Sequence, residues 1–454
     1  MTDLFQAPKG TRDFLPPAMA VRRYIEDAWR KVSLRYGFQE VDGPTFESLD
    51  LYKVKSGDEI ISQLFAFTDR GGRDLALRPE FTPTVARMVA QLGGGLPKPI
   101  KWFSIPRCYR AEQPQKGRLR EFIQWNVDFI GDSSFAADRE CLAVCAASLF
   151  ELGLTANDFK VSWNHRDLMA ELLVGLGLRA DKLADTFYVL DRLQKLNDAE
   201  RDKLLQSRDF LSSEKEILHL FASEMHKPEA EQTELKALLS GPAARAVYEK
   251  IMVLQDQLSL PELAESFKWD FGLVRGLAYY TGFVFEVADA KGENRAVAGG
   301  GRYDKLIEIF GGKPTPAVGF GMGDVVLEIL LTDRGLLPDK PLGGPDVFIV
   351  NASGDGDLTD LWASRLRRST FDRTIKAVIQ RGLRVEHSYK STKNIGKLLQ
   401  EAAAAQARFA LILAPDELSR QVVKWRNMQS RTESEFPISQ AETLIRAACG
   451  GGGD

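Results

Sequence analysis

The feature that most constrains the fold is a change of hydrophobic periodicity along the chain. Residues 1–166 combine strand-like apolar runs with helical segments at 18–36 and 84–91, and the strand pattern resumes at Trp269, whereas residues 167–266 show helical spacing, frequent charges and little glycine after Gly177. At 454 residues the chain is too long for one ordinary core. The pattern therefore predicts a strand-rich domain over 1–166 and 267–337, interrupted by a helical insertion.

A second domain is expected after a linker at residues 338–345, within the Pro/Gly-rich stretch LLPDKPLGGP. Beyond it, over 346–448, short apolar strands alternate with helical segments, which predicts an α/β domain with a mostly parallel sheet. Within this domain we expect one long helix over residues 358–380. We expect the glycine-rich tail, residues 449–454, to be disordered.

Two segments rich in arginine, glycine and tyrosine are the first candidates for a ligand site. They read RGLAYYTG at residues 275–282 and AGGGRYD at residues 298–304. The guanidinium of Arg275 offers paired hydrogen bonds to a carboxylate or phosphate, and successive glycines let a ligand or another backbone approach closely. Two Gly-rich turns at the ends of core strands are the simpler interpretation.

A second candidate is a charged hairpin, with strands expected over 101–110 and 120–131 and a polar loop between them. Its cations are Arg107, Arg110, Lys116, Arg118 and Arg120. Arginines so clustered can hold the phosphates of a nucleotide in a chain without a P-loop sequence. A solvated charged loop is the alternative.

Two acids, Glu80 and Asp128, stand among apolar residues in strand-like surroundings. Acids in such places are usually paired or bind a cation. A salt bridge and a ligand contact both remain open for each of them. The glycines of residues 319–323 suggest a dinucleotide loop only weakly, because the βαβ context and the following acid are missing.

Composition narrows the functional classes. A net charge of −3 gives no bulk attraction to nucleic acid, and four cysteines without ligand spacing favour reduced thiols over zinc. The four histidines show no triad or metal spacing. The chain has no signal-type N-terminus and no apolar run of membrane-spanning length, so we expect a cytoplasmic protein without membrane attachment.

At this point the motifs resemble those of one family, the histidyl-tRNA synthetases. RGLAYYTG is similar to the family's histidine-binding signature, and AGGGRYD is similar to its second signature. Residues 36–44, 109–122 and 318–331 resemble motifs 1, 2 and 3 of class II synthetases, and KGTRDFLP near the N-terminus is typical of the family. The resemblance implies an α+β catalytic domain built on a mainly antiparallel sheet, with a helical insertion and a C-terminal α/β anticodon-binding-like domain.

The resemblance also implies an activity, partners and residue roles. The activity is ATP-dependent formation of histidyl-adenylate followed by transfer to tRNA(His), in a homodimer, with Mg²⁺ arriving with ATP and no metal assigned to protein side chains. The residues implied are, for catalysis, Arg275 and Arg110; for ATP, Arg110, Glu112 and Arg118; for histidine, Glu80, Thr82, Gln124, Asp128, Arg275, Tyr280 and Tyr303.

Two departures from the family pattern bear on this interpretation. Ala278 replaces the usual acid of the first signature, and Val326 stands where motif 3 usually has an arginine. Arg118, Arg120 or Arg302 is a candidate to compensate for that arginine.

Two other functional classes remain as alternatives. A catalytically silent histidine-binding paralogue, such as a regulatory subunit of ATP phosphoribosyltransferase, fits the altered motif 3 but not the separate C-terminal domain. An RNA-binding module without chemistry leaves the histidine signatures unexplained.

Overall fold

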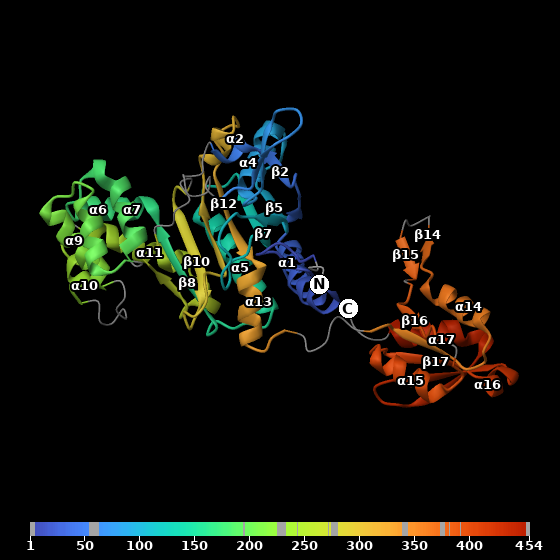
Figure 1. Ribbon diagram of the computed structural model, residues 1–454. Coiled ribbons are helices and arrows are strands. Elements are labelled where there is room, and N and C mark those ends of the chain that lie inside the picture. The colour runs from blue at the N-terminus through green and yellow to red at the C-terminus, as the bar shows by residue number, and fades with distance from the viewer. Residues whose placement is uncertain are drawn as a thin grey trace. The chain divides into compact units, whose positions relative to one another are not determined.

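The computed structural model describes most of the chain. The described residues are 5–53, 63–193, 196–224, 233–242, 244–270, 272–273, 280–337, 344–372, 377–380, 382–390 and 392–450. The chain divides into two compact units, one of residues 1–15 and 21–337 and the other of residues 16–20 and 338–454 (Figure 1). The larger unit holds a nine-stranded and a three-stranded sheet, and the smaller unit holds a five-stranded and a two-stranded sheet.

The larger unit is built on a nine-stranded sheet. In spatial order its strands are β1 (Gln39–Glu40), β5 (Ile100–Ser104), β7 (Glu121–Ile130), β12 (Ala317–Gly323), β11 (Ala298–Arg302), β10 (Phe283–Asp289), β8 (Phe159–His165) and β9 (Phe267–Trp269), with β6 (Arg107–Tyr109) also paired to β7. The β1–β5 and β8–β9 pairs are parallel and the others are antiparallel. The expected mainly antiparallel sheet is confirmed.

Helices cover one face of this sheet, namely α1 (Pro16–Arg35), α5 (Phe135–Glu151) and α13 (Asp324–Asp333). Trp29 of α1 stacks on Trp125 of β7 with ring centroids 5.9 Å apart, and Trp125 meets Phe320 of β12 edge-on at 5.0 Å. Successive strand residues face opposite sides of a sheet. Since Trp125 faces the helices, Gln124 and Asp128 face the other side.

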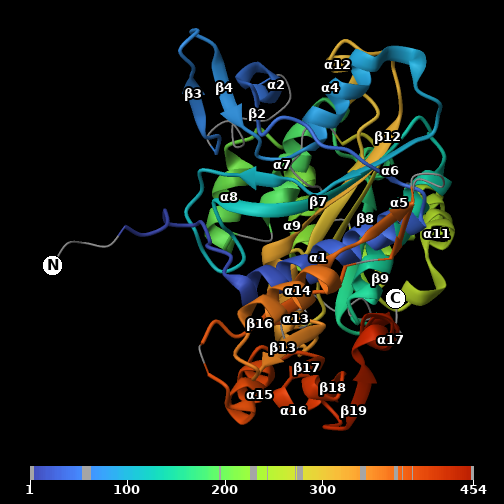
Figure 2. The same cartoon turned by 90° about the vertical axis from the view of Figure 1, so that its right-hand side faces the viewer.

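That other side carries smaller elements. They are α2 (Leu49–Lys53), α4 (Thr82–Leu92), η1 (Gly93–Gly95), α12 (Leu306–Ile309) and a three-stranded sheet of β2 (Phe46–Ser48), β4 (Asp74–Leu77) and β3 (Ala66–Thr68). The small sheet lies beside α2 and α4 (Figure 2). Phe81 and Val85 pack here in one buried cluster with Tyr280, Tyr303 and Leu306.

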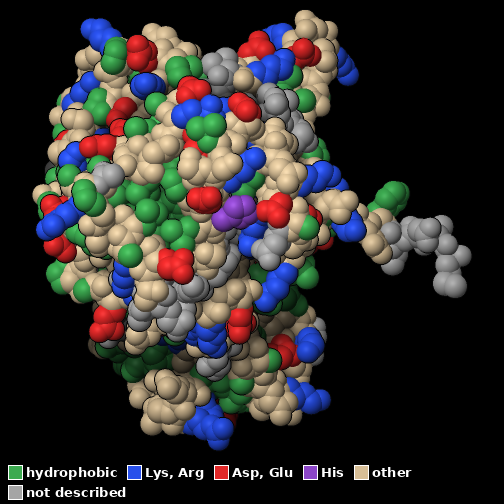
Figure 3. All heavy atoms as spheres, turned by 90° about the vertical axis from the view of Figure 1, so that its left-hand side faces the viewer, with side chains coloured by type: hydrophobic (Ala, Val, Ile, Leu, Met, Phe, Trp, Pro, Cys, Tyr) green, Lys and Arg blue, Asp and Glu red, His purple; other side chains and the backbone are tan. Residues whose placement is uncertain are grey.

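The stretch of helical spacing forms helices as expected. They are α6 (Arg166–Gly175), η2 (Ala180–Lys182), α7 (Leu183–Leu193), α8 (Asp198–Gln206), α9 (Ser212–Glu224), α10 (Thr233–Leu239), α11 (Arg245–Leu258) and η4 (Pro261–Leu263). On the face drawn in Figure 3, basic and acidic side chains are interspersed.

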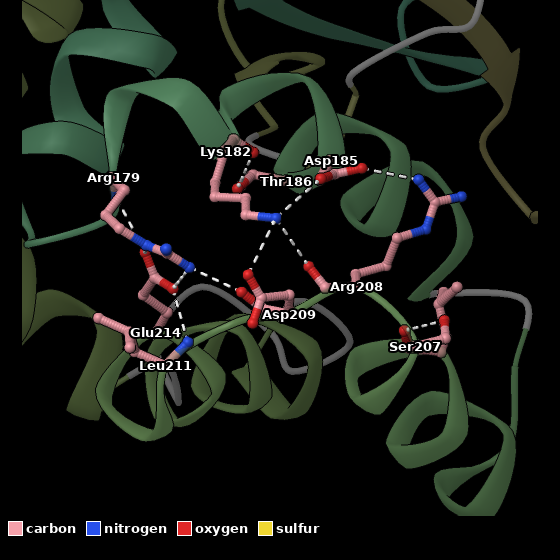
Figure 4. Close-up of polar contacts among 10 residues, drawn as sticks. Arg179, Lys182, Asp185, Thr186, Ser207, Arg208, Asp209, Leu211 and Glu214 are labelled. Atoms are coloured by element: carbon pink, nitrogen blue, oxygen red, sulfur yellow. Dashed lines mark hydrogen bonds and ion pairs between the residues drawn. The ribbon is translucent and has the colours of Figure 1, made fainter.

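A polar network joins three of these helical segments (Figure 4). Buried Glu214 accepts hydrogen bonds from Arg179 Nε at 3.0 Å and from the backbone N–H of Leu211 at 2.7 Å. The Arg179 hydrogen bond is the main reason that the pKa of Glu214 falls to about 2. Lys182 lies between two carboxylates, Asp185 and Asp209, each 3.6 Å from its Nζ.

The smaller unit is an α/β domain whose sheet is mixed. Its elements are β13 (Val347–Asn351), α14 (Gly356–Arg367), β14 (Thr370–Asp372), β15 (Ala377–Gln380), β16 (Val385–His387), α15 (Ile395–Ala404), β17 (Phe409–Leu413), α16 (Pro415–Ser419), β18 (Val422–Asn427), β19 (Glu433–Pro437) and α17 (Ile438–Gly450). The sheet order is β16-β13-β17-β18-β19. The pairs β16–β13 and β13–β17 are parallel, and the pairs β17–β18 and β18–β19 are antiparallel. The sequence predicted a mostly parallel sheet, and half of the strand pairs are parallel.

Three sequence expectations about local structure are wrong. The helix expected over residues 358–380 ends at Arg367 and is followed by the β14–β15 hairpin, where β-branched and aromatic residues favour strands. Cys449 and Gly450 belong to α17, while residues 451–454 lie outside the described residues. The strand expected over 101–110 is interrupted before β6, because Pro106 has no N–H for a ladder.

Candidate active site

A buried acid–tyrosine pair forms the centre of the candidate site. Tyr303, directly after β11, donates a hydrogen bond to Asp128 Oδ1 on β7, and the two side chains are 1% and 2% exposed. Burial raises the pKa of Asp128 to about 7; the hydrogen bond from Tyr303 opposes this effect and the charge of Glu80 adds to it. Asp128 Oδ2 has no hydrogen-bond partner among the described residues. It is therefore an acceptor that a ligand can use.

Glycines on β12 make room for this arrangement. Gly319 pairs with Asp128, and a Cβ added to Gly319 would lie 2.7 Å from Asp128 Oδ1. A Cβ on Gly321 would lie 2.8 Å from Gln124 Nε2, whereas one on Gly323 would meet nothing within 4 Å. Gly319 and Gly321 therefore let the polar side chains of β7 lie across the neighbouring strand, which is a different role from binding a dinucleotide.

Residues 78–82 run along the charged hairpin. The backbone N–H of Tyr109 donates to the carbonyl of Arg78 at 2.9 Å, and Arg110 Nε donates to the carbonyl of Pro79 at 3.1 Å. Glu80 follows directly and is buried. These contacts bring Glu80, one of the expected histidine-binding residues, next to Arg110.

The remaining expected histidine-binding residues come from α4, from β7 and from the segment before β10. Thr82 is the first residue of α4, and Gln124 lies on β7 four residues before Asp128, on the same face of the sheet. Tyr280 is buried, and the neighbouring Thr281 donates its N–H to the carbonyl of Arg302 at 2.8 Å, which places Tyr280 beside the end of β11. Arg275 lies outside the described residues.

The hairpin carries the expected ATP-binding residues. Its strands β6 and β7 pair as predicted. The guanidinium of Arg110 lies 5.1 Å from the ring centroid of Phe122, and Arg118 forms an ion pair with buried Glu112. Arg120 Nε donates to the Glu112 carbonyl at 3.0 Å. The three expected ATP residues, Arg110, Glu112 and Arg118, thus lie on one loop, and Arg110 among them lies next to Glu80.

Arg302, a candidate to replace the motif 3 arginine, is engaged elsewhere. Its Nε lies 2.8 Å from Asp138 of α5, and its Nη atoms donate to the carbonyls of Asp132 at 3.0 Å and Ser134 at 2.7 Å. It pairs with Val318 on the side of the sheet that the helices cover. Its buried ion pair joins sheet and helix, so Arg302 is no substitute for the missing cation.

The successive glycines of β11 serve backbone approach. A Cβ on Gly300 would lie 2.2 Å from the carbonyl oxygen of Gly319, and one on Gly301 would lie 2.5 Å from that of Phe283. Of the two interpretations offered by the sequence, close approach of neighbouring strands accounts for both residues.

The described residues also bear on metals and membranes. No three histidine, cysteine or carboxylate side chains among them gather in a group that could hold a metal ion. None of the described helices has the length and apolar character that crossing a membrane requires.

The chain is similar to known proteins over nearly its whole length. A family model described as histidyl-tRNA synthetase matches residues 10–324, and a model described as anticodon binding domain matches residues 361–448. The histidine–tRNA ligase of Opitutus terrae is 40% identical over 443 residues, covering 97% of this chain and 98% of that protein. The histidine–tRNA ligase of Pyrococcus abyssi is 36% identical, covering 98% and 99%.

Solved structures agree on the fold. A histidyl-tRNA synthetase from Nostoc sp. PCC 7120 superposes with a TM-score of 0.74 at 21% identity, over 98% of this chain and all of that one. A Bacillus halodurans protein described as an ATP phosphoribosyltransferase regulatory subunit/histidyl-tRNA synthetase gives a TM-score of 0.67 at 24% identity, over 91% of this chain and all of that one. At these identities the likeness establishes architecture alone.

Proposed function

The chain belongs to the histidyl-tRNA synthetase family, and from that premise we propose that it is a histidine–tRNA ligase. It activates histidine with ATP to histidyl-adenylate and then transfers the histidyl group to tRNA(His). The observation that carries the proposal is the buried Asp128–Tyr303 pair, which lies on the same sheet as the arginine-bearing β6–β7 hairpin. A silent histidine-binding paralogue has no need of those arginines.

At the amino-acid end, Asp128 Oδ2 accepts a hydrogen bond from an imidazole N–H while Tyr303 holds Oδ1 in place. Tyr280 contacts the ring. Glu80 attracts the α-ammonium group, and Thr82 and Gln124 complete its recognition. A pocket built to hydrogen-bond a polar ring discriminates strongly against amino acids that lack those groups.

At the nucleotide end, Arg110 holds the α-phosphate and Arg118 reaches the outer phosphates, releasing Glu112 toward the adenine. Mg²⁺ bound to the phosphate oxygens of ATP would supply charge neutralisation there, and no protein side chain is assigned to hold it. Arg275, assigned from the sequence signature alone, bridges the histidine carboxylate and the α-phosphate.

The chemistry needs positioned cations more than a base. The histidine carboxylate is already ionised at neutral pH, so its oxygen attacks the α-phosphorus directly. The new O–P bond forms as the bond to the β-bridging oxygen breaks, and pyrophosphate leaves with those electrons. Fixed arginines lower the repulsion between the two anions and stabilise the charge in the transition state.

We assign residues 1–166 and 267–337 to the catalytic domain, 167–266 to its helical insertion, 338–345 to a linker and 346–448 to an anticodon-binding-like domain. We further propose that the protein works in the cytoplasm as a homodimer, as motif 1 implies.

Histidine-dependent exchange between ATP and pyrophosphate tests activation, and charging of tRNA(His) tests transfer. We expect both with histidine and neither with alanine at the same concentration. Histidine binding without exchange would support the regulatory alternative, and exchange without charging would point to an adenylate-forming paralogue.

A further inference from the structure

We propose that Arg295, on the loop between β10 and β11, supplies the cation for the outer phosphates of ATP that Val326 does not provide. The inference rests on the proposed function and deepens it by adding a residue to the nucleotide end of the site. None of the three arginines suggested by the sequence is Arg295.

Val326 packs against the tip of the charged hairpin. It lies in the first turn of α13 and is buried against the tip of the charged hairpin, since a Cβ added to Gly117 would come within 3.3 Å of Val326 Cγ2. Gly117 has a φ of +75°, which glycine adopts without strain. The loop tip therefore rests on an aliphatic side chain at this point of α13.

Arg295 lies beside the same hairpin tip. The same Cβ position on Gly117 lies 3.8 Å from Arg295 Cδ, so the side chain of Arg295 passes the hairpin tip beside Val326. The guanidinium begins one bond beyond Cδ. Arg295 is exposed, and its guanidinium makes no hydrogen bond or ion pair with any residue that the structure describes. It therefore reaches the hairpin tip with its donors available to a ligand.

Hydrogen bonds hold the loop that bears Arg295 in place. Asn294 Nδ2 donates to Asp289 Oδ2 at 3.1 Å, and the backbone N–H of Gly323 donates to the carbonyl of Val297 at 3.3 Å. Gly323 is the residue that caps the start of α13. Arg295 is thus tied, two residues away, to the helix start that carries Val326.

Two neighbouring arginines, Arg12 and Arg118, have ion-pair partners of their own. Arg12 is paired with Asp324 and Glu328 of α13, and Arg118 is paired with Glu112. Arg302 is buried against α5, as described above. Of Arg12, Arg118, Arg302 and Arg295, Arg295 alone has no ion-pair partner among the described residues. The hairpin also carries exposed Lys116, and Arg120, whose Nε donates to the Glu112 carbonyl at 3.0 Å.

The chemistry selects the outer phosphates as the ligand. A guanidinium binds phosphate oxygens through paired N–H donors, and the hairpin tip that Arg295 passes also carries Arg118, expected at those phosphates. Arg295 is accordingly a phosphate-binding residue, and its loss should weaken ATP binding much more than histidine binding.

The test compares Arg295→Ala with Lys291→Ala. Lys291 is exposed on the same loop, carries the same charge, and makes no polar side-chain contact with a described residue. In histidine-dependent exchange, Arg295→Ala should raise the KM for ATP roughly ten- to a hundredfold, the loss expected for hydrogen bonds to a charged group. The KM for histidine should stay within about twofold in both variants, and Lys291→Ala should match the wild type for ATP.

Competition by AMP, which lacks the outer phosphates, separates this role from a general one. Arg295→Ala should leave inhibition by AMP within about threefold of the wild type. An unchanged KM for ATP, or an equal weakening of ATP and AMP, would overturn the inference. If the wild type itself shows no exchange, the proposed function fails, and equilibrium binding of ATP and AMP to the same three proteins still decides the role of Arg295.

Discussion

Replacing Asp128 by asparagine separates what the buried acid costs the fold from what it does for the ligand. The side chain keeps its shape and can still accept the hydrogen bond from Tyr303, but it no longer ionises. Burial has raised the pKa of the wild-type carboxyl from the usual 3.8 to about 7. The folded protein therefore holds this proton more tightly than the unfolded chain does.

The sign and size of the effect follow from that difference. A carboxyl with a raised pKa contributes stability that is fully present below its unfolded pKa and is lost as the pH rises through the folded pKa. At about 1.4 kcal/mol for each tenfold change in the ionisation constant, the raised pKa of Asp128 lowers the free energy of unfolding, relative to a side chain that cannot ionise, by about 4 kcal/mol at pH 8 and about 2 kcal/mol at pH 5. At pH 5 the folded carboxyl is protonated, and the cost arises because the carboxyl of the unfolded chain ionises. Between these two pH values, this single group should lower the free energy of unfolding by roughly 2–3 kcal/mol.

Urea unfolding of ligand-free wild type and Asp128→Asn, followed by tryptophan fluorescence at fixed protein concentration, measures this difference. The stability of the variant relative to wild type should increase from pH 5 to pH 8 by that amount. The variant should also raise the KM for histidine at least about tenfold, because an amide and a carboxylate present different groups to the imidazole. Parallel pH dependences for the two proteins would refute the reasoning, since Asp128 would then ionise equally in folded and unfolded chains.

Further predictions concern the site and its supports. Gly319→Ala should raise the KM for histidine at least about tenfold by displacing Asp128, whereas Gly323→Ala, on the same strand with open space, should not; equal effects would contradict the packing argument. Arg302→Ala should lower the free energy of unfolding by about 3–5 kcal/mol through its broken buried ion pair, measured in urea, with no change in the KM for ATP. Glu214→Gln should cost about 2 kcal/mol near neutral pH, and the difference should shrink as the pH falls from 4.5 toward 2 because the wild-type carboxyl is then protonated. Arg275→Lys should slow exchange far more than it weakens histidine binding, and normal exchange would rule out the proposed bridging role.

Local patterns in the sequence carried much of the architecture. The change of periodicity located the helices between residues 166 and 263, and the turn-rich loop after Arg110 located the β6–β7 hairpin. The long helix expected over 358–380 was wrong because its second half pairs as a hairpin. Residues 370–372 and 377–380 include strand-favouring types and pair with one another. The spacing of apolar residues along the chain does not reveal that pairing.

What the sequence determined by itself is the family, through motifs whose residues are adjacent in the chain, and the kinds of side chain available to bind histidine and ATP. The tertiary structure decided which of them meet. Asp128 and Tyr303 are 175 positions apart, and their contact depends on the register of β7, β12 and β11. The same register sends Arg302 to the helix side of the sheet, against Asp138, although it adjoins Tyr303 in the chain. Shifting a strand by one residue exchanges the faces of all its side chains, so a residue's place in the site is fixed by long-range pairing. That pairing also brings Arg295 to the hairpin tip beside Val326.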